Sequence, residues 1–255
     1  MSPLQTGLIV AVLMMGGALA GAFLRKRLSE RHFDEETKDF VKLGLGFLAT
    51  LSALVMGLVI SSSKASYDAK SDMVHSAAVL VIQLDASLRR LGLAGDPIRH
   101  EVRQDLAANM AQIWPSVGGV AELPNTGATR HRLGAIQKML FDLPGANEAQ
   151  RSTQLDALKT LADLARINAV SFTQQGSGVI APLLMVVACW MTLNIAGWNL
   201  FAPHNRMVVI VNLISSLSVA SAIFLIMEMD QPFDGIIRIS DAPMRAAFLK
   251  LAEQP

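Results

Sequence analysis

The chain has little of what soluble enzymes and nucleic-acid-binding proteins use. Charged residues make up only 17% of its 255 residues, and the formal net charge is +1. A chain this close to neutral lacks the basic excess that binds a phosphate backbone, so nucleic acid is not an expected partner. Its single cysteine, Cys189, excludes an intrachain disulfide and the paired thiolates of a zinc site.

The sequence motifs of the common catalytic classes are also missing. There is no Gly-rich phosphate loop, no HExxH and no Gly-x-Ser-x-Gly. Asp68, Asp72 and His75 fall on one helical face at a spacing that can hold a metal ion, but a solvated face is the favoured interpretation. We therefore expect no enzymatic activity, no cofactor and no bound metal.

What the sequence has instead is long hydrophobic runs. Hydrophobic residues make up 52% of the chain, and the mean hydropathy is +0.40. Four stretches without formal charge are long enough for a bilayer-spanning helix, which needs about 20 residues. The predicted spans are residues 4–24, 42–62, 179–201 and 207–227.

The first span is predicted to be a retained membrane helix. A cleaved signal peptide carries its positive charges before the apolar core, whereas Arg25, Lys26 and Arg27 follow it here. The loop after the first span is therefore basic, and so is the turn that contains Arg206. Because positive residues favour the cytoplasmic side, both termini and the long middle segment are predicted to be extracytoplasmic.

The middle segment, residues 64–176, is predicted to form a helical bundle. Apolar residues at three-four spacing indicate amphipathic helices, and the first of them can continue without a break from the second span. Asp96-Pro97 indicates one helix start and Asn147 another, with a Gly- and Pro-rich loop near 116–128. The predicted fold class is all-α: four transmembrane helices, with a four-helix bundle inserted between the second and third.

This organisation divides the chain into four parts. They are the first two spans with their basic loop (1–63), the bundle (64–176), the last two spans (177–228), and a turn with a short amphipathic helix (229–255). Ser240 is expected to cap that last helix. The helix is then expected to lie either on the membrane surface or against the bundle.

The second span has a bulky face and a small face. The bulky face contains Phe47, Leu51, Leu54 and Leu58. The nearly opposite face contains Ala49, Ala53 and Gly57. Small residues at this spacing let helix backbones approach closely, and Gly17-x-x-x-Gly21 in the first span suggests the same. Close packing explains the pattern most simply. The sharper hypothesis is that the bulky face lines a hydrophobic constriction in an oligomeric pore.

The fourth span is polar within and acidic at its end. Its polar residues are Asn212, Ser215, Ser216, Ser218 and Ser221, which are expected to bond to neighbouring helices or their own backbone, or to line a wet path. Glu228, Asp230 and Asp234 follow, although a helix C-terminus normally favours basic residues.

These three acids are candidates for an acidic mouth or ion-binding site. A ring of such acids attracts cations, and their charge can be balanced by Lys64, by Lys70 or by a bound cation. Solvated acids at the membrane interface are the alternative. No acid or base lies deep within a span, which argues against the ionisable relay of a proton-coupled transporter and leaves a passive channel open.

The chain has several distinctive segments: QLDASLRRLGLAGDPIRHEV with the following IWP, then NLFAPHN, and then SVASAIFLIMEMDQPFDGIIRISDAPMRAAF. In these segments the chain resembles a bacterial membrane-protein family of unknown function that is sometimes labelled bestrophin-like. The resemblance covers nearly the whole chain. It implies a homopentameric, anion-conducting channel of the bacterial inner membrane, with its pore lined by the second membrane helix.

Two features depart from that pattern. The basic loops place the large domain outside the cytoplasm, whereas bestrophins keep theirs inside, and no run of acids resembles the calcium-binding clasp of animal bestrophins. The leading hypothesis is a homo-oligomer that conducts ions passively, with the lipid bilayer and inorganic ions as its partners. The alternative is a non-conducting membrane scaffold or sensor whose extracytoplasmic bundle binds a partner.

Overall fold

The regular elements of the chain are helices throughout the part that the structure describes. The computed structural model describes residues 2–27, 34–115, 126–144, 147–173, 180–203 and 205–252. The elements in chain order are α1 (Pro3–Arg27), α2 (Glu35–Arg90), the short 3₁₀ helix η2 (Gly92–Ala94), α3 (Asp96–Ile113), α4 (Thr126–Phe141), α5 (Glu148–Thr173), α6 (Ile180–Phe201), α7 (Arg206–Asp230) and α8 (Ala242–Ala252). The predicted all-α class is confirmed.

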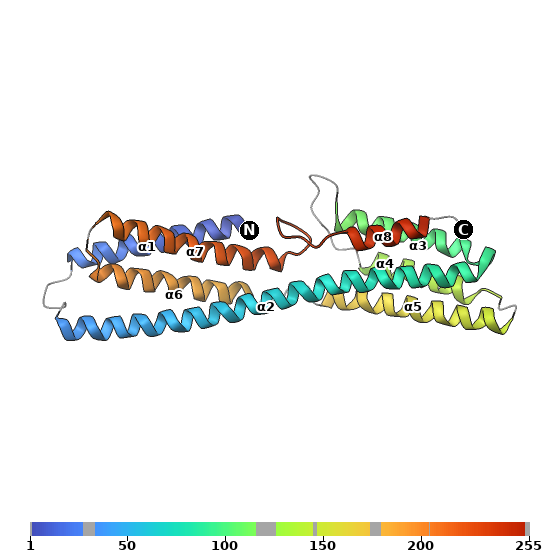
Figure 1. Ribbon diagram of the computed structural model, residues 1–255, viewed down its shortest axis with the longest axis horizontal. Coiled ribbons are helices and arrows are strands. Elements are labelled where there is room, and N and C mark those ends of the chain that lie inside the picture. Colours follow the sequence, from blue (N-terminus) through green and yellow to red (C-terminus); the bar gives the residue numbers. More distant parts are fainter. Residues whose placement is uncertain are drawn as a thin grey trace. The chain divides into compact units, whose positions relative to one another are not determined.

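The chain folds as two compact units. The first contains residues 1–66 and 177–230, and the second contains residues 67–176 and 231–255. Figure 1 shows α1, α6 and α7 beside the N-terminal part of α2, and α3, α4, α5 and α8 around its C-terminal part. The uninterrupted α2 supports the prediction that the second span continues into the bundle.

Four helices of the described chain are long and apolar enough to cross a membrane. They are α1, α2, α7 and the part of α6 from Pro182 to Phe201. The predicted spans fall within these helices, apart from the first residues of the third span, of which residue 179 lies outside the described part of the chain. Most of the predicted loop at 116–128 also lies outside it, and α4 already begins at Thr126.

Close approach of backbones joins α1 to α6 in the first unit. A Cβ atom on Gly17 would lie 2.9 Å from the backbone oxygen of Thr192, and one on Gly21 would overlap the backbone oxygen of Ala196. The GxxxG expectation for the first span is therefore confirmed. The small face of α2 behaves differently, because a Cβ on Gly57 would meet no atom of this chain within 4 Å.

Side-chain amides satisfy polar groups between the helices of the first unit. Asn199 and Asn212 exchange two hydrogen bonds, with N–O distances of 3.1 and 2.8 Å, and so link α6 to α7. The amide of Asn194 donates to the backbone oxygen of Leu45 at 2.7 Å, linking α6 to α2. Arg25 donates to the backbone oxygen of Ala202 just beyond α6. In an apolar surrounding, each such bond removes the cost of an unpaired polar group.

The serines of α7 lie in different surroundings. Ser218 donates to the Ile214 carbonyl at 2.8 Å, and Ser221 donates to the Ser218 carbonyl at 2.9 Å. Both bonds stay within the helix, so these hydroxyls can face an apolar surrounding without a second helix. Ser216, in contrast, is 1% exposed and lies in the interior of the unit.

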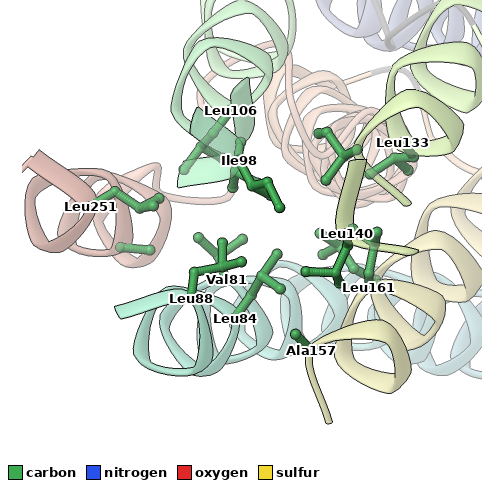
Figure 2. Packing of buried hydrophobic residues seen from close by; sticks show 14 of the residues in the cluster. Val81, Leu84, Leu88, Ile98, Leu106, Leu133, Leu140, Ala157, Leu161 and Leu251 are labelled. Atoms are coloured by element: carbon green, nitrogen blue, oxygen red, sulfur yellow. The ribbon is translucent and has the colours of Figure 1, made fainter. Parts of the chain in front are cut away.

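The second unit has a core of leucine, isoleucine and valine drawn from five helices. Figure 2 shows these side chains pointing toward one another: Val81, Leu84 and Leu88 from α2, Ile98 and Leu106 from α3, Leu133 and Leu140 from α4, Ala157 and Leu161 from α5, and Leu251 from α8. Burial of such side chains is the main favourable contribution to the folding of the unit. The amphipathic stripes read from the sequence supply most of this core.

The predicted helix starts have different outcomes. Asn147 caps α5 as predicted, because its side-chain oxygen accepts the backbone N–H of Gln150 at 2.8 Å. A helix does begin at Asp96, as predicted. The expectation that Asp96 itself caps this helix is wrong, since the cap residue is Gly95 and Asp96 is already in the first turn. Glycine is required there because a Cβ on Gly95 would overlap the carbonyl oxygen of Leu88.

The C-terminal helix α8 lies against the bundle, one of its two expected positions. Asp85 is 5% exposed and forms ion pairs with Arg89 at 2.8 Å and Arg99 at 2.7 Å. The two guanidinium groups donate in turn to the backbone oxygens of Lys250 (2.7 Å) and Leu251 (3.4 Å). Positive charge at these last carbonyls complements the helix dipole and holds the end of α8.

A second buried acid lies between α3 and α4. Asp105 is 9% exposed, its carboxylate is 2.9 Å from Arg132, and it accepts the amide of Asn109 at 3.0 Å. Burial raises the pKa of Asp105 above its ordinary value of 3.8, and Arg132 and Asn109 offset only part of that rise. The folded protein therefore holds this proton at a higher pH than the unfolded chain.

The close contact between α1 and α6 predicts a site-specific intolerance of side chains. Gly21→Ala should destabilise the protein in detergent by about 1–3 kcal/mol, since the added Cβ overlaps the Ala196 carbonyl. The matched control is Gly16→Ala, where no atom lies within 4 Å of the added Cβ. Thermal unfolding followed by size-exclusion chromatography measures both, and equal midpoints for the two variants would contradict the packing.

Burial of Asp105 predicts a pH dependence. Between the unfolded pKa near 3.8 and the raised folded pKa, the folded state binds more protons, so its free energy of unfolding falls as pH rises through that window. Asp105→Asn removes this contribution, so its stability should improve relative to wild type across the window and then stay level. Unfolding midpoints measured from pH 3.5 to pH 7 check this, and parallel curves for the two proteins would argue against it.

Candidate functional site

The bulky face of α2 points away from the other helices of the first unit. Phe47, Leu54 and Leu58 are 71%, 62% and 64% exposed, and Leu51 is half-buried. The structure therefore places all four predicted pore residues on the outer side of α2, with Leu51 nearest to its edge. An apolar surface of this extent needs lipid or another subunit to cover it.

A different line of residues holds α2 to its unit. Ser52, Met56, Val59 and Ser63 recur at four-three-four spacing, and each is at most 8% exposed. Met56 and Val59 share an apolar cluster with residues of α1, α6 and α7. The Ser52 hydroxyl is buried at little cost because it donates to the Leu48 carbonyl at 2.7 Å. Sequence reasoning missed this face, which mixes serines with two apolar residues and so lacks a uniform stripe.

The three acids after the fourth span do not share one environment. Glu228 is only 4% exposed, in the last turn of α7. Asp230 ends that helix and is half-buried, and Asp234 is half-buried in the turn that follows. Lys64, one of the two lysines considered as a balancing charge, is exposed on α2. Asp230 and Asp234 are thus the accessible members of the predicted acidic group.

The segment after α7 is a closed turn. Asp234 donates its backbone N–H to the Gln231 carbonyl at 3.2 Å, and Ile239 donates to the Pro232 carbonyl at 2.7 Å. Gly235 has φ of 95°, a left-handed conformation that glycine adopts without strain. The chain therefore turns at Asp234-Gly235, within the segment 229–255 where the sequence predicts a turn.

Trp114 fastens this turn to the end of α3. Its ring nitrogen donates to the Ile239 carbonyl at 2.9 Å, and its ring meets Phe233 edge-on with centroids 5.8 Å apart. In the sequence, Trp114 stands out only as part of the IWP segment that carries the family resemblance. The signal that was available is that a buried tryptophan needs a partner for its N–H, but nothing in the sequence names that partner.

An open groove of about 590 Å³ lies between α2 and α5 in the second unit. It is lined by Met73, His75, Ser76, Val79, Leu80, Gln83, Asp163, Arg166 and Ile167. The lining is mostly apolar, with a few polar and charged side chains from both helices. Sequence reasoning missed this groove because its two walls are about 80 residues apart in the chain.

The possible metal-binding face of α2 brings no ligands together. Asp68, Asp72 and His75 are all exposed. Within the described ranges, no group of three or more His, Cys, Asp or Glu side chains is placed to hold a metal ion.

Comparison with known proteins gives one family and one fold. A family model described as "Bestrophin-like domain" matches residues 12–244. The fold is similar to crystal structures of variants of a bacterial bestrophin homologue from Klebsiella pneumoniae. One has a TM-score of 0.69 at 12% identity, and another 0.68 at 14%, each covering 98% of this chain and 97% of the other. A crystal structure titled only as a membrane protein has a TM-score of 0.67 at 12% identity, with 95% of this chain and 97% of the other covered.

No curated protein matches the sequence. At these identities the structural likeness concerns the fold, and the family model carries the relationship in sequence. The family resemblance predicted from the sequence is confirmed, because the family match covers most of the chain and spans both units.

Proposed function

Because this chain belongs to the bestrophin-like family, we propose that it is a membrane ion channel, a homo-oligomer that conducts ions passively across the bacterial inner membrane. The observation that carries the proposal is the outward apolar face of α2, which the rest of the first unit leaves uncovered. The number of subunits, five, comes from family analogy alone. No catalytic residue, cofactor or metal is part of the proposal.

The proposed neck is built from Phe47, Leu51, Leu54 and Leu58. Their four-three-four spacing extends over about 16 Å of helix at 1.5 Å per residue. Copies of α2 arranged around an axis would stack these side chains as rings of large apolar groups. Such a constriction controls ion passage by losing or admitting water.

The acids after α7 are proposed to bias the outer mouth toward cations. Asp230 and Asp234 are half-buried and hence partly accessible to ions. Glu228 is only 4% exposed, so its proposed contribution is the charge of a buried carboxylate. A ring of carboxylates raises the local cation concentration electrostatically. This preference is opposite to the anion conduction that the family analogy implies.

Four spans with both termini and the second unit outside the cytoplasm are proposed as the topology. The basic residues Arg25, Lys26, Arg27 and Arg206 support it through the positive-inside preference. One of them also has a structural role, since Arg25 bonds to the Ala202 carbonyl. The position of Arg25 is therefore explained by helix packing as well as by the proposed topology.

The alternative function is a non-conducting scaffold or sensor whose second unit binds a partner. The observation that favours it is the open groove between α2 and α5, which has the mixed apolar and charged lining of a binding surface. A scaffold requires neither an axial opening nor a hydrated neck, so measurements of ion flux separate the two functions.

Ion flux through liposomes containing the purified protein tests conduction. Wild-type protein should dissipate a salt gradient, and the double variant Leu54→Ser with Leu58→Ser should do so several-fold faster because the neck becomes hydrated. The matched control is Ala53→Ser, which adds a hydroxyl at an exposed position away from the proposed neck. The reversal potential in the same salt gradient reports ion preference, and Asp230→Asn should reduce any preference for cations.

Conduction is rejected if properly folded, oligomeric protein carries no flux at any salt concentration or voltage. A monomer or dimer in mild detergent would point the same way and favour the scaffold. Equal acceleration by Ala53→Ser and by the double serine variant would remove the bulky face of α2 from the proposed pore.

The topology is tested by labelling a single cysteine in intact cells. Leu93→Cys, made together with Cys189→Ser, places the thiol at a position that is 90% exposed in the second unit. A membrane-impermeant maleimide should label it without permeabilisation of the inner membrane. Labelling only after permeabilisation would place the second unit in the cytoplasm, as in the bestrophins.

A further inference from the structure

The turn that follows α7 has a fixed shape. Between Gln231 and Ser240 the backbone is closed by the N–H of Ile239, which donates to the Pro232 carbonyl, and the ring nitrogen of Trp114 donates to the carbonyl of Ile239. Pro232 and Ile239 are buried. Two anchors at the base leave the residues between them as a defined tip.

The tip presents an apolar side chain and a basic one outward. Ile236 directly follows the left-handed Gly235 and is 77% exposed, and Arg238 is also exposed. Single exposed hydrophobic residues are ordinary on protein surfaces, so exposure alone says little. What distinguishes Ile236 is where the chain places it.

Ile236 lies six residues beyond the last residue of a helix that is apolar enough to span a membrane. At about 3.4 Å per residue, six residues reach at most about 20 Å, and the closed turn shortens that reach. The headgroup region between hydrocarbon and water is roughly 5–8 Å thick on each side of a bilayer. The tip is therefore within reach of the bilayer surface at the end of α7.

The neighbouring candidate for membrane contact is already engaged. The apolar face of α8 carries Ala247 and Leu251, which are buried in the core of the second unit. Arg103 additionally stacks on Phe248, 5.3 Å from the ring centroid. The closed turn combines an exposed apolar residue with an exposed cation, a pairing suited to the interface, where apolar groups enter the acyl boundary and basic groups meet phosphate.

We propose that the turn from Asp234 to Arg238 is a lipid-contact site. Ile236 inserts its side chain into the interfacial region of the bilayer, and Arg238 pairs with the phosphate of an anionic phospholipid. The closed turn and Trp114 hold both residues in place, so that the second unit is fastened to the membrane surface independently of the spanning helices. This role needs only membrane localisation and is separate from the question of conduction.

Lipid quenching of a single labelled cysteine tests the contact. Ile236→Cys in the full chain, combined with Cys189→Ser, is labelled with an environment-sensitive fluorophore and reconstituted into vesicles of phosphatidylglycerol and phosphatidylethanolamine with brominated or ordinary acyl chains. The matched control is Leu93→Cys, which is also an exposed apolar residue of the second unit but lies far along the chain from the predicted apolar spans 42–62 and 179–201.

Brominated lipid should quench the label at residue 236 several-fold more strongly than the label at residue 93. Equal quenching at the two positions would overturn the proposal. A label at residue 236 that is shielded from both brominated lipid and aqueous iodide would also overturn it, because the turn would then contact protein.

The arginine is tested separately by thermal unfolding in the same two lipids. Raising the phosphatidylglycerol fraction should increase the unfolding midpoint of wild type more than that of Arg238→Gln. The control Arg90→Gln, which removes an exposed arginine at the end of α2, should respond as wild type does. An Arg238→Gln response equal to wild type would remove the arginine from the contact.

Discussion

The pairing of polar groups that leave water shapes both units of this protein. An unpaired amide or carboxylate in an apolar surrounding costs several kcal/mol by transfer arguments, so each has to be met by a partner within reach. In the first unit, Asn199 and Asn212 meet each other, and Asn194 meets the Leu45 carbonyl. In the second, Asp85 holds two arginines that bind the last carbonyls of α8. These bonds decide which helices are neighbours.

The inner contacts of the first unit use only one side of α2, so its opposite side remains exposed. In the first unit, glycines join α1 to α6, and Ser52, Met56 and Val59 face inward from α2 beside apolar residues of α1, α6 and α7. Phe47, Leu54 and Leu58 lie on the other side of α2 and are not part of this packing. They are available to contact lipid or another subunit, or to line the proposed pore, and such contacts would not disturb the packing inside the unit. In the proposed channel, the residues that hold a subunit together are separate from those that line the pore.

The acidic segment after α7 takes on a different meaning once the turn is seen. Glu228 belongs to the interior, whereas Asp230 and Asp234 remain partly accessible. The proline, phenylalanine and glycine around them form a closed turn that Trp114 holds from a distant part of the sequence. What reads as a charged helix end leads into a closed turn that precedes α8. The proposed lipid contact depends on the closed shape of that turn.

Hydrophobic length and spacing determined the helices, the segments able to span a membrane, the amphipathic stripes of the second unit and the cap at Asn147, because each depends on residues close together in the chain. The four-residue spacing of Gly17 and Gly21 also predicted close packing, but not that α6 would be the partner. Only the tertiary structure decided the contacts made across long separations. It buried Glu228, turned Phe47, Leu54 and Leu58 outward, docked α8 on the bundle and joined Trp114 to Ile239. Such contacts depend on which distant surfaces meet, and local periodicity carries no information about that.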